Sequence, residues 1–268
     1  MTTRRWGALI AGLILLGFVA ACLAAPWLAP YPPDAVDLSQ LRAAPSAAHW
    51  LGTDDLGRDV LSRLLFGGRV SIFIGLTAAI VGTGVGALVG ATAGYLGGAI
   101  DNVLMRVTDV AFAIPTLPLA IVLGSYAGDK MLSMVIIIGA LSWMTTARVI
   151  RGEVLTIREA GYVEAARSLG QRGPAMLSRH VIPNVAGSLI VSATLGVGNA
   201  ILVESALSFL GLGVQPPVPT WGNMLTDAQA TMATKPWLTI FPGIAILIVI
   251  LCVNVCGEAL RPSRQRTG

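Results

Sequence analysis

The sequence predicts an all-α integral membrane protein with about six transmembrane helices. Only 12% of its 268 residues are charged and 54% are hydrophobic, whereas about a quarter of the residues in a soluble domain are charged. The charges leave several apolar stretches of about 20 residues, the length that an α-helix needs to cross a bilayer. The backbone of such a stretch satisfies its hydrogen bonds in lipid only as a helix. The alternative, a large soluble protein with an unusually apolar core, is disfavoured by the low charge.

Six spans follow from the apolar stretches. They are expected at residues 7–28, 70–95, 103–125, 131–149, 187–212 and 238–258. The third span carries Arg106 and Asp109, which lie three residues apart and are expected to pair on one helix face. Pro115 and Pro118 each lack a backbone donor, so they should bend this span.

The first span has two interpretations. Arg4 and Arg5 precede an apolar run that reaches Val19-Ala20-Ala21-Cys22, which resembles a lipoprotein signal with its cleavage cysteine. The run continues to Leu28, however, and therefore has the length of a membrane span rather than of a short signal segment. We expect an uncleaved first helix, with processing at Cys22 as the alternative.

The region before the second span is expected to be exposed to water. Residues 59–66 place apolar side chains at helical spacing and polar ones opposite, which predicts a short amphipathic helix at the membrane interface. We therefore divide the chain into residues 1–69, the first span with this segment, and 70–268, a five-helix core. Within the second span, Gly82, Gly86, Gly90 and Gly94 form a small-residue ladder that predicts close helix packing.

The segment at about 150–186 is expected to be a charged loop of helix, break and helix. Six Arg and three Glu lie between Arg148 and Arg179. Apolar residues from 154 to 169 have helical spacing, Gly170 is expected to end that helix, and Gly173-Pro174 to start the next. Pro183 then marks the entry to the fifth span.

The basic residues predict an orientation with both termini in the cytoplasm. With that topology, 12 of the 18 Lys and Arg face the cytoplasm, which agrees with the positive-inside rule. The twelve are Arg4, Arg5, Arg106, Arg148, Arg151, Arg158, Arg167, Arg172, Arg179, Arg261, Arg264 and Arg266. The arginines at 58–69 lie outside in this topology, which weakens the agreement with the rule. Because most basic residues have a role in fixing the orientation in the membrane, the net charge of +4 does not indicate a nucleic-acid partner.

Candidate reactive groups are few. Cys22, Cys252 and Cys256 all lie in expected spans with too few other ligands nearby for a metal site, so they are interpreted as small apolar residues. Glu204 lies deep in the fifth span, where a carboxylate is costly and usually faces the bundle interior or a water-filled path. With Ser205 and Ser208 it either faces a translocation path or gate, or bonds to a neighbouring helix.

The charged loop carries a recognisable motif. Glu164-Ala165-Ala166 is followed after three residues by Gly170, and after nine more by His180-Val181-Ile182-Pro183. This spacing resembles the EAA loop of ABC importer permeases, although His180 departs from the usual final tetrad. Two alanines give a helix a low relief that a partner surface can approach closely. The resemblance implies a helix that couples to an ATPase, with Tyr162, Glu164, Ala165, Ala166, Arg167, Leu169, Gly170 and Pro183 as its residues.

Two further segments narrow the resemblance and extend it over the whole chain. Residues 51–59, Leu-Gly-Thr-Asp-Asp-Leu-Gly-Arg-Asp, and residues 204–213, with Trp221-Gly222 after them, are similar to the C-type subunit of dipeptide and oligopeptide permeases. That family also includes nickel and glutathione permeases, and some members are associated with haem. We therefore expect a type I ABC importer permease fold in a bacterial plasma membrane, with peptides as the first candidate solute.

The resemblance also implies partners. These are a second, B-type permease subunit, two ATP-binding subunits or one fused ATPase, an extracytoplasmic solute-binding protein, and membrane lipid. Asp54, Arg58 and Trp221 are expected to contact the binding protein. The chain has no Gly-x4-Gly-Lys-Ser/Thr loop, so ATP and Mg²⁺ are expected on the partner ATPase, with no cofactor and no catalysis in this chain.

Two other functional classes compete with this interpretation. An ion-coupled secondary transporter would need acidic or histidine relays inside the spans, and Glu204 alone supports that class. An intramembrane enzyme is excluded because the spans contain no Gly-x-Ser-x-Gly, no His-Glu-x2-His and no pair of carboxylates.

Overall fold

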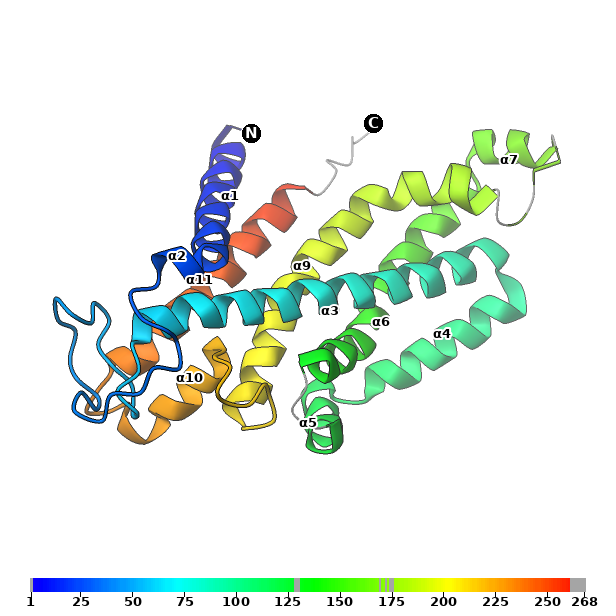
Figure 1. Cartoon of the computed structure of the whole chain (residues 1–268). Helices are drawn as coiled ribbons and strands as arrows, with labels where there is room; N and C mark the ends of the chain where they lie inside the picture. Colours follow the sequence, from blue (N-terminus) through cyan, green and yellow to red (C-terminus); the bar gives the residue numbers. More distant parts are fainter. Residues whose placement is uncertain (1, 128–130, 169, 172, 174–175, 261–268) are drawn as a thin grey trace.

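The computed structural model describes residues 2–127, 131–168, 170–171, 173 and 176–260, and most of them are helical (Figure 1). The long helices are α1 (Thr2–Leu23), α3 (Val60–Leu96), α6 (Met131–Arg158), α9 (Ile182–Phe209) and α11 (Trp237–Ala259). The shorter ones are α2 (Ala25–Leu28), α4 (Gly98–Ala113), α5 (Thr116–Ala127), α7 (Gly161–Ser168), α10 (Trp221–Ala228), a π-helix at Leu177–Val181 and a 3₁₀ turn at Gln229–Thr231.

The prediction of an all-α protein with about six spans is confirmed. Five helices of the described chain are long and apolar enough to cross a membrane: α1, α3, α6, α9 and α11. The third expected span is instead two helices, α4 and α5, which meet at a bend of 83°. Pro115 follows Ile114, whose backbone is extended at ψ 124°, the conformation that a residue before proline prefers. The predicted bend is therefore correct at Pro115, whereas Pro118 lies in the first turn of α5 without bending it.

The helices alternate in direction between two ends of the bundle. In Figure 1 the segment between α2 and α3 lies with α10 at the lower left, whereas α7 lies at the upper right. The start of α1 and the end of α11 point toward the upper edge, as α7 does. We call these the α10 end and the α7 end.

The glycine ladder of α3 packs directly on α6, as predicted. A Cβ added to Gly86 or Gly90 would overlap the carbonyl oxygen of Trp143 or Ala147 on α6. The two backbones therefore approach closely along several turns, because glycine leaves room for the neighbouring helix. The core beside this contact is apolar and joins α3, α6 and α9, with Ile74, Ala78, Met134, Ile138, Ala200 and Leu207 among its buried members.

The helix predicted at residues 59–66 is present from Val60, but it is the start of α3 and not a separate short helix. Asp59 caps the helix by accepting a hydrogen bond from the Ser62 backbone amide at 2.8 Å. Val60 and Leu64 pack in one cluster with Met224 of α10 and Leu238 of α11, so these two apolar side chains face other helices of the bundle. Since α3 runs unbroken from residue 60 to 96, the boundary expected at 69/70 falls inside a helix.

Candidate functional site

The helix that carries the Glu-Ala-Ala motif, α7, has one anchored face and one open face. Val163 and Ala166 are buried and pack with Met176 against Tyr95 of α3 and Ile157 of α6. On the opposite side Tyr162, Glu164 and Ala165 are exposed. The motif therefore presents a small, low-relief surface while two of its side chains hold the helix against the bundle.

The turn after α7 is closed by a glycine and a side-chain bond. Gly170 has φ +86°, a left-handed conformation that glycine adopts at helix ends without strain. The Gln171 backbone amide donates to the Ala166 carbonyl at 3.1 Å, and the Gln171 side chain lies 2.9 Å from His180 Nε2. The prediction that Gly170 ends the helix is confirmed. His180, the departure from the usual motif, connects the segment after the turn to Gln171.

The helix expected at 154–169 is broken, which the periodicity did not predict. Helix α6 ends at Arg158 and α7 begins at Gly161. The Ala160 carbonyl then accepts from the amides of Val163 and Glu164, which starts the new helix. The break turns Val163 toward Tyr95. Among the motif residues, Pro183 lies in the first turn of α9, Leu169 lies outside the described residues, and the side chain of Arg167 is not described.

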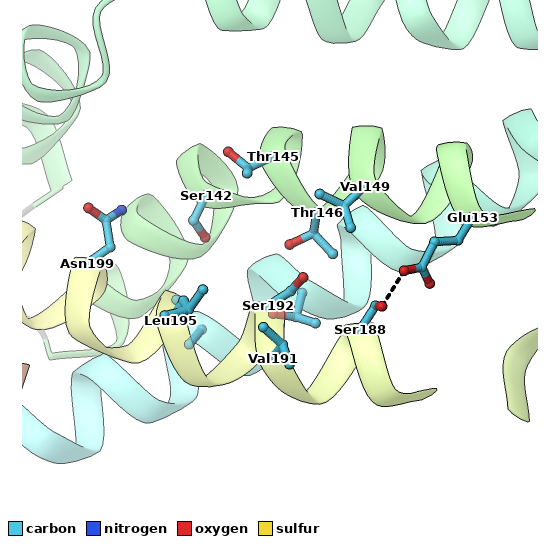
Figure 2. A pocket seen from close by; sticks show the side chains of 13 residues that line it. Ser142, Thr145, Thr146, Val149, Glu153, Ser188, Val191, Ser192, Leu195 and Asn199 are labelled. Carbon is cyan, nitrogen blue, oxygen red and sulfur yellow. Dashed lines mark hydrogen bonds between the residues drawn. The ribbon is translucent and has the colours of Figure 1, made fainter. Parts of the chain in front are cut away.

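A groove of about 770 Å³, lined by polar and apolar side chains, lies between α3, α6 and α9 (Figure 2). Eight of its 13 lining residues are polar: Thr83, Ser142, Thr145, Thr146, Glu153, Ser188, Ser192 and Asn199. None of the 13 is Lys, Arg or His. Figure 2 shows Glu153 reaching from α6 toward Ser188 of α9, whose hydroxyl donates a hydrogen bond to Oε1 of the carboxylate.

Sequence reasoning missed this groove. Its polar residues on α6 lie on one helix face, from Ser142 through Thr145 and Thr146 to Glu153. The same holds on α9, where Ser188, Ser192 and Asn199 share a face. Such spacing marks a polar face on an apolar helix, and it is the feature of the sequence from which the groove could have been predicted.

Glu204 does not line this groove. Its side chain is fully buried and accepts hydrogen bonds from Ser208 at 2.8 Å and from Ser71 of α3 at 3.1 Å. Ser205, also buried, lies 3.4 Å from the same carboxylate. The bond to Ser71 crosses from α9 to α3, which supports the interpretation that Glu204 holds two helices together. A role for Glu204, Ser205 and Ser208 at a gate stays a prediction.

The residues expected to contact a binding protein are buried at the α10 end. Trp221 is fully buried, and its indole nitrogen donates to the Leu64 carbonyl at 3.0 Å. Arg58 donates to Asp54 at 2.6 Å and to Asp227 at 3.2 Å. In this structure Asp54, Arg58 and Trp221 therefore stabilise the α10 end and offer almost no surface to a partner.

A second arginine completes the charge cluster at that end. Arg63 is 2% exposed and lies 3.1 Å from Asp227 and 3.3 Å from Asp54. Burial raises the pKa of Asp227 above its usual value, and Arg63 opposes that effect. Asp54, Asp55 and Asp227 also bring three carboxylates together. Since the two arginines already pair with these carboxylates, their guanidinium groups stand where a cation would bind.

Comparisons with known proteins agree with this architecture. The model of the binding-protein-dependent transport system inner membrane component family matches residues 86–266, and that of the N-terminal TM domain of oligopeptide transport permease C matches residues 3–45. A glutathione transport system permease protein of Pectobacterium atrosepticum is 39% identical over 259 residues, which cover 96% of this chain and 86% of that protein.

Two further relatives are similar over nearly the whole chain. A putative peptide permease protein of Brucella suis is 42% identical, covering 95% of this chain and 85% of the relative. The oligopeptide transport system permease protein of Haemophilus influenzae is 38% identical, covering 95% and 83%. The chain therefore belongs to the binding-protein-dependent transport system inner membrane components, the permeases of ABC importers, and within them to the oligopeptide permease C-like family.

Proposed function

We propose that this chain is one of two permease subunits of an ATP-driven importer of di- and oligopeptides. It contains no ATPase of its own and converts nucleotide hydrolysis by partner subunits into alternating access across the bacterial plasma membrane. The partners are a B-type permease, two ATP-binding subunits or one fused ATPase, and an extracytoplasmic binding protein.

The observation that carries this proposal is the geometry of α7. Its exposed side chains include the small Ala165 beside Glu164, and its other face is packed on Tyr95 and Ile157. A force on the open face is therefore transmitted to α3 and α6 instead of merely displacing a loop. That is what a subunit needs when a neighbouring motor drives it.

The same loop supports the orientation that we propose. With α7 and both termini in the cytoplasm, the arginine-rich segment lies on the side that the positive-inside rule favours. The α10 end then faces outward, where a binding protein delivers its solute. Because Asp54, Arg58 and Trp221 are buried there, the contact surface would be formed by exposed neighbours such as Trp50 and Leu56.

The groove between α3, α6 and α9 supplies half of a translocation path, with the B-type permease closing the other half. Its hydroxyl and amide groups suit a solute rich in peptide bonds, which offers donors and acceptors along its length. Relatives named for peptides, oligopeptides and glutathione support this solute class. Glutathione, a nickel chelate and haem are the alternatives, and an ion-coupled transporter is the alternative of another class.

Cysteine labelling tests the orientation and the coupling contact together. Ala165→Cys, on the open face of α7, is made in a background where the three native cysteines are alanine. We expect a membrane-impermeant maleimide to label it only in permeabilised cells, and a bifunctional reagent to crosslink it to the ATP-binding subunit. Ala230→Cys, exposed near α10, is the matched control and should be labelled in intact cells. Labelling of Ala165→Cys in intact cells, or the absence of any crosslink, would overturn the proposal.

A further inference from the structure

The groove contains one charged side chain. Glu153 is the single ionisable residue among the 13 that line it, and the remaining polar groups are neutral hydroxyls and one amide. Neutral groups of this kind bind amides without regard to charge. Among the residues of this chain that line the groove, Glu153 is therefore the one that can give it a preference for solute charge.

Glu153 is not neutralised by the arginines of its own helix. Arg151 donates twice to Asp101 of α4, at 2.5 and 2.6 Å, and Arg148 donates to Asp109 at 2.7 Å. Arg158 donates to the Tyr95 carbonyl at 3.3 Å. These arginines are thus committed to α3 and α4, and among the described residues no ion pair involves Glu153.

The partner that Glu153 has leaves its charge intact. Ser188 donates one hydrogen bond to Oε1 and is itself neutral, so it orients the carboxylate without neutralising it. A carboxylate accepts about four hydrogen bonds in all, so capacity remains for a ligand. The side chain is half-buried, and a charge in a partly desolvated cavity acts more strongly than one on an open surface.

We propose that Glu153 makes this groove selective for solutes by charge, so that cationic peptides pass faster than anionic peptides of the same length. This inference rests on the proposed function, since it assumes that solute traverses the groove. A positive group is drawn toward the oriented carboxylate, whereas a negative one is repelled. The neutral hydroxyls meanwhile accept any peptide backbone.

The test measures a ratio of uptake rates. The complete importer is reconstituted in liposomes with ATP on the side of its ATP-binding subunits. Its binding protein is saturated in separate experiments with Ala-Lys-Ala and with Ala-Glu-Ala. The cation-to-anion ratio of wild type is compared with that of Glu153→Gln. We expect the ratio to fall about tenfold, which corresponds to about 1.4 kcal/mol. Because both proteins use one binding protein, its own preference cancels in the comparison.

A second variant protects the test against misfolding of the first. Thr145 lines the groove but is exposed, so Thr145→Lys adds an opposing charge while Glu153 stays in place. It should lower the ratio as well. Glu159→Gln and Thr156→Lys make the same charge changes at exposed sites outside the groove, and both should keep the wild-type ratio.

The outcomes separate the inference from the proposed function. If wild type imports both peptides and neither groove variant changes the ratio, Glu153 does not select by charge and only this inference fails. The same holds if the two control variants lower the ratio as much as the groove variants do. If wild type hydrolyses ATP but imports neither peptide, the proposed function fails and the inference fails with it.

Discussion

Replacing Glu204 with alanine is expected to destabilise the folded permease by about 3 kcal/mol. The change removes the hydrogen bond from Ser71, which joins α3 to α9, and interhelical bonds of this kind contribute about 0.6–1.7 kcal/mol. It also removes the bond from Ser208, for about 1 kcal/mol. The lost methylene, fully buried in the native protein, adds about 0.8 kcal/mol.

Glu204→Gln is the matched control. It keeps the methylene and one carbonyl oxygen that accepts from a serine, so the expected loss is about 1 kcal/mol. The measurement is the free energy of unfolding of the purified subunit in mixed micelles, followed with increasing denaturing detergent. Uptake by the assembled importer is measured on the same preparations.

The two interpretations of Glu204 then separate. If it holds the helices together, stability falls strongly with alanine and weakly with glutamine, and uptake follows stability. An alanine variant within about 0.5 kcal/mol of wild type would refute this reasoning. A glutamine variant that is stable but does not transport would instead assign the carboxylate to the gate.

Three more predictions follow from the geometry. Glu164→Lys, which reverses a charge on the open face of α7, and Gly170→Pro, which cannot adopt φ +86°, should leave ATP hydrolysis in place but abolish its coupling to uptake. Full transport in both variants would contradict the coupling role. Gly90→Val should lower the free energy of unfolding by at least about 2 kcal/mol because it overlaps α6, while Gly84→Val, which meets no atom within 4 Å, should be nearly neutral. Asp227→Asn should lower the unfolding temperature of the purified subunit, because it leaves the buried Arg63 with Asp54 as its one remaining carboxylate partner. An unchanged temperature would count against the cluster.

Composition and periodicity predicted the features that depend on one helix at a time. The spans follow from the length of apolar runs, and the glycine ladder on α3 specifies close packing whatever the partner helix is. The bend at Pro115 could be placed for the same reason, because proline acts locally. Its size of 83° could not, since it depends on how α5 packs on its neighbours.

The features that the sequence did not predict concern surfaces that two or more elements share. The apolar face at residues 59–66 has the same helical spacing whether it meets lipid headgroups or α10 and α11, so the spacing alone could not decide between these two surroundings. Arg58 was predicted to be exposed because the sequence does not show that Asp227, 169 residues later, lies beside it. The groove needs the relative rotation of α3, α6 and α9, which no single stretch of sequence contains.

The interlocked backbones of α3 and α6 restrict how this protein can move. Glycines of one helix sit against carbonyl oxygens of the other, so neither can slide or rotate past its neighbour without a collision. Helix α7 packs on both of them at Tyr95 and Ile157, so a force applied to α7 would move the pair as one body. Any change in the width of the groove would then come from movement of the α3–α6 pair relative to α9, which forms its other wall.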